Sequence, residues 1–291
     1  MFRGPDHIAM RIGQSGLCAM ASQRTTSAMI HALLALLMSL VPFAAAAQME
    51  EGQPKEVRVI QRTMEVGGVA YAWSVLIPDS AAEGGAAILF LHGAGECGSD
   101  GEKNLAVGLP RHVRENPEQW PFVLIVPQKP TRESEWEDHE KALLAMLDEA
   151  AKEGLYDPKR LAITGLSQGG HGTIMLASMH PERFRAAAPV CGYVDRRFDQ
   201  SGMLVKEIPA TADDASVVAA AKALAAMPVW LFHGSLDDVV PPEESRALHA
   251  AIVELGGLVE YNEFPGANHN SWDAAYSKSE LAEWFAEQMR E

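Results

Sequence analysis

The chain has little cysteine and none of the residue spacings that usually hold a metal ion. Only three of its 291 residues are cysteines, and the sequence contains no H-E-x-x-H, no C-x-x-C and no EF-hand loop. These absences argue against a disulfide scaffold and against a zinc or calcium site. We therefore expect no metal and no other cofactor.

Basic residues are also in deficit. The sequence has 24 lysines and arginines against 39 acidic residues, which gives a formal net charge of −15. An acidic surface repels phosphate backbones and anionic lipid headgroups, so nucleic acid and membrane surfaces are poor candidate partners. The plainer interpretation, which we favour, is that the acidic excess keeps the protein soluble.

The N-terminal part of the chain has the layout of an export signal. Arg11 and Arg24 precede an apolar run over residues 28–43, and small residues follow as far as Ala47. This order predicts a secretory signal peptide cleaved near Ala47, and hence a periplasmic or secreted protein. A membrane anchor is the alternative, but the run is short for a full span and is broken by Pro42. The long stretch before the run leaves a later methionine open as the true start.

Strand-like and helix-like segments alternate after this signal. Two β-runs at 55–63 and 69–77, joined by two glycines, predict an antiparallel beginning. Short apolar runs predict further strands at 86–91, 122–126, 161–164, 186–190, 229–232 and 259–264. Helical periodicity predicts helices at 137–153, from the turn after 164 to about 180, and at 215–226, 242–255 and 279–290.

This alternation predicts an α/β fold with a mostly parallel central sheet, antiparallel N-terminal strands and helices on both faces. The sequence shows no internal repeat and no low-complexity linker, so residues 48–291, after a signal over 1–47, are expected to form a single domain. The longest irregular segment, 193–214, is too short for a large cap domain. That length predicts a fairly open site.

The segment Gly165-Leu166-Ser167-Gln168-Gly169 has the pattern G-x-S-x-G between a predicted strand and a predicted helix. In that context the pattern is a nucleophile elbow, in which the small residues permit a turn sharp enough to expose the serine hydroxyl. The helix dipole favours negative charge that develops there. The pentapeptide alone is weak, but its context makes Ser167 the candidate nucleophile.

A serine nucleophile needs a base, and the base needs an acid to orient it. Asp237 and Asp238 follow the predicted strand 229–232, and His269 follows the strand 259–264. The carboxyl ends of parallel strands share one edge of the sheet, so these side chains are expected to approach Ser167. We prefer Asp237 over Asp238 because it falls earlier in the turn. The alternative for each of these three residues is that it is an ordinary loop residue with no catalytic role.

Two backbone N–H groups are the candidate oxyanion hole. One belongs to Gln168, which directly follows the candidate nucleophile, and the other to Ala94 in the loop after strand 86–91, with Gly95 close behind. The same loop formally matches the dinucleotide pattern G-x-G-x-x-G. That pattern should open a helix in the first βαβ unit, whereas here two strands precede it and a loop follows, so NAD binding is not favoured.

Trp136 and Trp272 each allow two interpretations. Either could line a substrate pocket, and either could be an ordinary packing aromatic. Cys97 and Cys191, the two cysteines after the signal, could form one disulfide in an oxidising compartment or remain two thiols.

Taken together, the motifs resemble the bacterial exported carboxylesterases of the α/β-hydrolase superfamily, in the dienelactone-hydrolase-like and polyhydroxybutyrate-depolymerase-like branch that also includes proteins labelled predicted peptidases. The resemblance spans residues 55–290. It rests on residues 90–96, 126–128, 157–160, 164–170, 188–192, 232–237 and 269–273. Two positions depart from the pattern: Cys97 stands where relatives commonly carry arginine, and residues 192–195 replace a more glycine-rich run.

The resemblance implies Ser167, Asp237 and His269 as the triad and the Ala94 and Gln168 amides as the oxyanion hole. Together with the residues, it predicts a serine esterase that cleaves small-molecule or oligomeric esters through an acyl-enzyme, without a cofactor. A peptidase using the same triad is the alternative within the class. A catalytically silent binding protein on a hydrolase fold is the alternative outside it.

Overall fold

The structure is a computed structural model that describes residues 56–195 and 210–290. The expected signal peptide, and most of the irregular segment after Tyr193, lie outside the described residues. The strands are β1 (Val57–Val66), β2 (Val69–Pro78), β3 (Ala87–Leu91), β4 (Val123–Pro127), β5 (Leu161–Leu166), β6 (Ala187–Val190), β7 (Val229–Gly234) and β8 (Val259–Phe264). The helices are α2 (Leu109–Glu115), α3 (Glu140–Lys152), α4 (Gln168–Met179), α5 (Ala215–Leu224), α6 (Glu243–Glu254), α7 (Trp272–Tyr276) and α8 (Ser279–Gln288), with short 3₁₀ turns η1 (Ala94–Glu96), η2 (Lys103–Leu105) and η3 (Glu137–His139).

The strands form one mixed sheet in the order β1-β2-β4-β3-β5-β6-β7-β8. β1 and β2 pair antiparallel from Val57 opposite Pro78 to Val66 opposite Val69, and β2 is also antiparallel to β4. All the other neighbours are parallel. The predicted antiparallel beginning and mostly parallel sheet are therefore confirmed.

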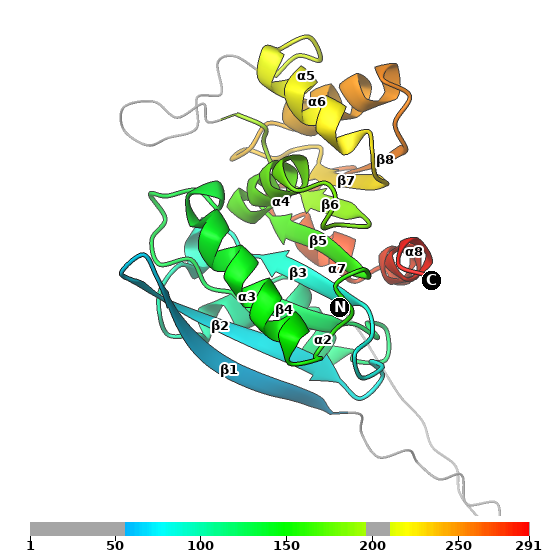
Figure 1. The fold of residues 1–291 in the computed structure, drawn as a ribbon. Coiled ribbons are helices and arrows are strands. Elements are labelled where there is room, and N and C mark those ends of the chain that lie inside the picture. Colours follow the sequence, from blue (N-terminus) through cyan, green and yellow to red (C-terminus); the bar gives the residue numbers. More distant parts are fainter. Residues whose placement is uncertain (1–55, 196–209, 291) are drawn as a thin grey trace, which may run out of the picture. The chain divides into compact units, whose positions relative to one another are not determined.

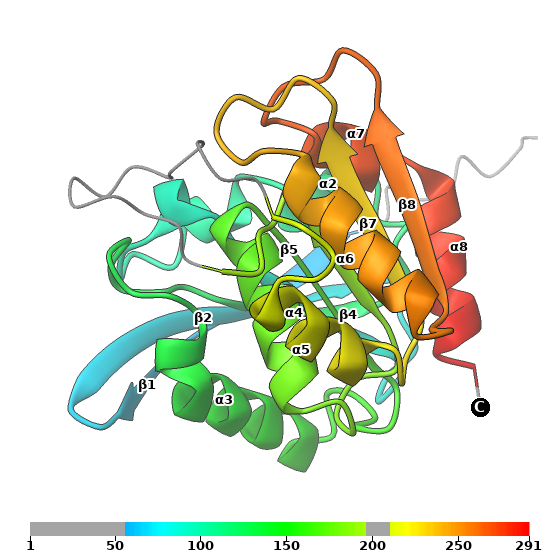
Figure 2. The same ribbon diagram turned by 90° about the horizontal axis from the view of Figure 1, so that it is seen from above.

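Helices cover both faces of the sheet, as Figures 1 and 2 show. On one face α3, α4, α5 and α6 bury their apolar side chains against the strands, and on the other face α2, α7 and α8 do so. The inner strands are buried along their whole length, which explains why their sequences are apolar on both faces rather than alternating.

Two helices were not expected from the sequence. α2 and α7 have seven and five residues, too few to display a helical period. α2 begins after Gly108, whose φ of 65° requires glycine, and carries Pro110 in its first turn. These local signals could have located the helix where periodicity could not.

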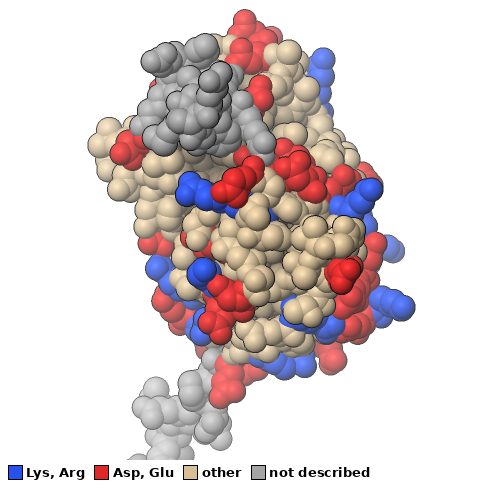
Figure 3. Space-filling view, turned by 90° about the vertical axis from the view of Figure 1, so that its left-hand side faces the viewer, with Lys and Arg blue, Asp and Glu red and all other residues tan. Residues whose placement is uncertain are grey.

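The described helices do not meet the requirements of a membrane span, and the face in Figure 3 does not carry a patch of one charge. None of the helices in residues 56–195 and 210–290 combines the length and the apolar character that a span needs. In Figure 3 acidic and basic side chains are interspersed, so the negative excess is not gathered on that face.

Candidate active site

Ser167 occupies the sharp turn between β5 and α4. Its φ of 55° and ψ of −116° lie in a backbone region that residues other than glycine rarely adopt. A Cβ on Gly165 or on Gly169 would overlap neighbouring backbone carbonyls, including that of Leu91 in β3. The chain can therefore turn here only with glycine at both positions, and the turn leaves Ser167 half-buried at the N-terminus of α4.

His269 lies on the loop after β8 and contacts Ser167. Its Nε2 is 2.9 Å from Ser167 Oγ, and its Nδ1 is 2.7 Å from Asp237 Oδ2. Because an ionised carboxylate only accepts hydrogen bonds, Nδ1 carries the proton, and Nε2 is left free to accept the serine proton. The three residues thus form a continuous hydrogen-bonded chain from three strand ends.

Asp237 is held by its own turn. Its Oδ1 accepts the N–H groups of Val239 and Val240, both at 2.9 Å. Burial would raise the pKa of Asp237, but hydrogen bonds from His233 and His269 and from the Val239 amide lower it well below its ordinary value, so the carboxylate is ionised. Asp238 is exposed and takes no part in this chain of contacts.

The two backbone amides expected to form the oxyanion hole each lie at the start of a helical turn. Gln168 and Ala94 are the first residues of α4 and η1, where N–H groups have no partner within the helix. A Cβ on Gly93 would lie 2.9 Å from Leu166 Cδ1 and 3.5 Å from Ser167 Cβ. The glycine that lets this loop approach the serine is therefore Gly93, whereas Gly95 is exposed and has open space around it.

His92 anchors the same loop through contacts that the sequence did not predict. It is 1% exposed, its Nδ1 is 2.6 Å from Gly93 O, and its Nε2 accepts the N–H of Lys129 at 2.9 Å. Burial lowers the pKa of His92 to about 3, so the ring is neutral near pH 7. The sequence signal was a histidine directly before a glycine at a strand end.

The side chain of Gln168 also has a structural role that the sequence did not reveal. Its Nε2 donates to the carbonyls of Arg132 and Ser134, both at 3.1 Å. These contacts attach the loop after β4 to the turn that carries Ser167.

The two tryptophans lie in different settings. Trp136 is 1% exposed, donates its indole N–H to His92 O at 3.1 Å and packs against Gly172, whose Cβ would collide with the indole. It is therefore a packing residue beneath the site. Trp272, at the start of α7, is partly exposed and meets the His269 ring edge-on at a centroid distance of 5.6 Å. Of the two, only Trp272 contacts a residue of the hydrogen-bonded chain.

Cys97 and Cys191 are free thiols, Cys97 half-buried and Cys191 fully buried. Cys191 Sγ lies within 4.8 Å of ligand atoms of Asp237 and His269, which makes a group of types that can bind metals. However, Asp237 and His269 are already bonded to each other, and burial raises the pKa of the Cys191 thiol to about 12. A metal needs the thiolate, so we interpret Asp237 and His269 as members of the hydrogen-bonded chain and not as metal ligands.

The only helical part of the loop from Gly93 to Gly98 is η1, a 3₁₀ turn of three residues. A dinucleotide site needs a longer helix whose N-terminus binds the pyrophosphate. The loop therefore has the geometry of an amide-donating turn rather than that of a nucleotide fingerprint.

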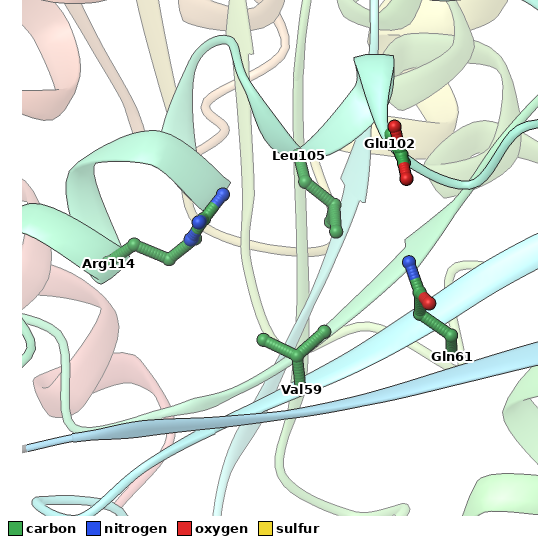
Figure 4. Close-up of a pocket in the computed structure, with 5 residues that line it drawn as sticks. All are labelled: Val59, Gln61, Glu102, Leu105 and Arg114. Carbon is green, nitrogen blue, oxygen red and sulfur yellow. The ribbon is translucent and has the colours of Figure 1, made fainter.

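A hollow of about 470 Å³ lies elsewhere, beside β1. Figure 4 shows Val59 and Leu105 in its middle, Arg114 at one end and Glu102 with Gln61 at the other. All five except Leu105 are exposed. None belongs to the hydrogen-bonded chain, so this hollow is separate from the candidate active site.

Comparison with known proteins identifies a family. The model of the prolyl oligopeptidase family, Peptidase_S9, matches residues 134–291, more than half of the chain. A protein of Arthroderma benhamiae named as an uncharacterized secreted protein is 32% identical over 115 residues. That match covers 37% of this chain but only 12% of the fungal protein.

Solved structures share the fold. One described as a thermostable esterase aligns with a TM-score of 0.66 at 28% identity, over 80% of this chain and 63% of that one, so this chain spans less than two thirds of its length. An acylaminoacyl peptidase of Pyrococcus horikoshii aligns with a TM-score of 0.63 at 16% identity, over 82% of this chain and 43% of that one, and shows the fold alone. The chain belongs to the prolyl oligopeptidase family and has the α/β-hydrolase fold.

Proposed function

We propose that the protein hydrolyses carboxylic esters through an acyl-enzyme on Ser167. The observation that carries this proposal is the pair of hydrogen bonds from Ser167 Oγ to His269 and from His269 to Asp237, at 2.9 and 2.7 Å. Ser167 Oγ attacks the ester carbonyl as His269 Nε2 takes its proton. The tetrahedral intermediate expels the alcohol, which receives that proton from His269.

Deacylation repeats the same steps with water. His269 takes a proton from the water that attacks the acyl-enzyme, and it returns the proton to Ser167 Oγ as the carboxylic acid leaves. The ionised Asp237 stabilises the imidazolium that forms in both halves. Backbone N–H groups of Gln168 and Ala94 hold the oxyanion, at the positive end of α4.

Two observations bear on the substrate. The similar structure at 28% identity is described as an esterase, and an alcohol leaves more readily than an amine. The family model, by contrast, bears the name of an oligopeptidase family, which makes peptide hydrolysis on the same triad the second candidate. We favour a small or oligomeric ester, because the irregular segment after Tyr193 is too short to form a large cap or an extended peptide-binding surface.

We further propose that the protein acts outside the cytoplasm, without a stable membrane anchor or a nucleic-acid partner. The signal-like N-terminus and the secreted relative support export. The acidic net charge of −15 supports the absence of a nucleic-acid partner.

Labelling with a fluorophosphonate tests the nucleophile. We expect wild type to be labelled and Ser167→Ala to be neither labelled nor active. Ser178→Ala is the matched control, because Ser178 lies on α4 and its hydroxyl makes no hydrogen bond with the described residues. An unlabelled wild type would indicate a catalytically silent binding protein. Labelling of Ser167→Ala would refute the assignment of the nucleophile.

A substrate panel tests the bond that is cleaved. p-Nitrophenyl esters of increasing acyl length are compared with p-nitroanilide peptides at equal concentration. We expect kcat/KM for the best ester to exceed that for the best anilide by at least about 100-fold. Comparable values would favour the peptidase.

A further inference from the structure

A second histidine lies against the acid of the proposed triad. His233, near the end of β7, has no exposed surface. Its Nε2 is 3.0 Å from the carbonyl oxygen of Val240 and 3.2 Å from Asp237 Oδ2. Its Nδ1 is 2.7 Å from the hydroxyl of Ser245 in α6. Both ring nitrogens are therefore engaged.

The partners of His233 decide which nitrogen donates. The Val240 carbonyl and the Asp237 carboxylate can only accept, so Nε2 carries a proton whether the ring is neutral or charged. In the neutral ring Nδ1 accepts from Ser245 Oγ–H. The two acceptors thus set the tautomer, and the hydroxyl of Ser245 supplies the hydrogen bond that Nδ1 needs in it.

This N–H group lies near both Asp237 and Val240, the two residues at the ends of the turn that positions the Asp237 carboxylate. Oδ1 of Asp237 accepts the amide of Val240, and the carbonyl of the same Val240 accepts from His233. Oδ2, on which His233 borders, is also the oxygen that accepts the Nδ1–H of His269. His233 therefore contacts the turn at the one oxygen that orients the base.

We propose that His233, held by Ser245, is a positioning residue that fixes the Asp237 carboxylate and shares its negative charge with His269. This inference rests on the proposed triad function. A structural histidine would only need to fill space between β7 and α6, whereas this one bonds the Val240 carbonyl and holds the same N–H group 3.2 Å from the Asp237 carboxylate. Its removal should therefore change how strongly Asp237 holds a protonated His269.

The other ionisable groups near this pair are few among the described residues. Cys191, directly after β6, lies near Asp237 as a protonated thiol, because burial raises the pKa of Cys191 to about 12. Glu263 at the end of β8 is near His233 but is paired with Arg246 at 2.6 Å, and hydrogen bonds from Arg246 lower the pKa of Glu263. The acidic limb of the pH profile should therefore report on Asp237 and His269.

The test compares two substitutions of the same residue. His233→Leu fills the space without a donor, and His233→Gln places an amide N–H near the position of Nε2. We expect His233→Leu to lower kcat by about 10- to 100-fold, as for the residues that hydrogen-bond to and orient metal ligands, with KM within about 2-fold. A carboxylate that lacks this donor holds the imidazolium more tightly, so the acidic limb of kcat should move to higher pH. His233→Gln should restore the limb and most of kcat.

Two further variants keep the inference falsifiable if His233→Leu does not fold. Ser245→Ala removes the hydroxyl that holds the Nδ1 side of the His233 ring and should shift the limb in the same direction by a smaller amount. His249→Leu is the control, because His249 also lies on α6 but contacts none of these residues and should leave the profile unchanged.

Fluorophosphonate labelling of wild type separates the two proposals. If wild type is not labelled at Ser167, the proposed function itself fails. If wild type is labelled but folded His233→Leu and Ser245→Ala keep the wild-type pH profile, then His233 has only a structural role and this inference is overturned.

Discussion

Asp237 Oδ2 lies 2.7 Å from Nδ1 of His269, whereas Asp238, the next residue along the chain, is exposed. The two aspartates have the same chemistry, so their positions in the turn make the difference. The amides of Val239 and Val240 both donate to Asp237 and fix its carboxylate over the sheet edge. Only one of the two can therefore orient His269.

This relationship predicts unequal effects of matched substitutions. In Asp237→Asn the amide would favour the wrong tautomer of His269, so kcat should fall by about 10³- to 10⁴-fold. Asp238→Asn should stay within about 2-fold of wild type. Steady-state ester hydrolysis measures both, with circular dichroism to confirm folding. Equal losses in the two variants would contradict the assignment of the acid.

The loop after β3 predicts a similar contrast between two glycines. A Cβ on Gly93 would press on Leu166 and approach Ser167, whereas one on Gly95 meets nothing within 4 Å. Gly93→Ala should displace the oxyanion loop and lower kcat by about 10- to 100-fold, less than the roughly 10²- to 10³-fold cost of losing an oxyanion donor outright. Gly95→Ala should behave as wild type. If Gly95→Ala proved the more damaging, the loop would approach the serine differently.

Buried His92 predicts a pH dependence of stability. Its pKa is lowered to about 3 in the folded protein, against about 6.5 in the unfolded chain. Above pH 6.5 neither state binds the proton. As pH falls from 6.5 towards 3, only the unfolded chain takes it up, so stability falls by up to about 1.4 kcal/mol per pH unit.

Replacing His92 should remove its contribution to the pH dependence of stability. His92→Asn should be less stable than wild type at pH 7.5, but its stability should fall less steeply between pH 6 and pH 4. Urea unfolding at four pH values measures the two slopes. Parallel slopes for wild type and variant would show that His92 is protonated in the folded state.

Much of the fold could be predicted because it depends on local chemistry. Buried parallel strands are apolar on both faces, and the glycines at 165 and 169 mark the turn at Ser167. The order of Ser167, Asp237 and His269, each after a predicted strand, could be read directly from the sequence. Predicting that these side chains meet needed only the rule that parallel strands end at one edge.

What the sequence did not predict depends on long-range contacts. The contact between His92 and Lys129 joins positions that no local pattern relates, and so does that between His233 and Ser245. The partners of both histidines appear only once the strands are side by side. Similarly, the burial of Trp136 follows from its packing against Gly172, which the sequence does not encode locally.

The thiols give a prediction that needs no substitution in the site. Burial raises the pKa of Cys191 to about 12, and its side chain is inaccessible, whereas Cys97 is half-buried. Because the thiolate is the reactive form, iodoacetamide at pH 8 should leave Cys191 unmodified in the folded protein and modify Cys97 slowly. Peptide mass spectrometry distinguishes the two sites, and both should react in denaturant without a reductant.

Activity links this experiment to the site. Cys191 lies beside Asp237 and His269, so an added carboxamidomethyl group there would disrupt the hydrogen-bonded chain. The folded protein should therefore keep its activity while Cys97 is modified, and Cys97→Ser should be insensitive to the reagent. Rapid modification of Cys191 with loss of activity would mean that β6 opens near the triad far more often than its complete burial implies.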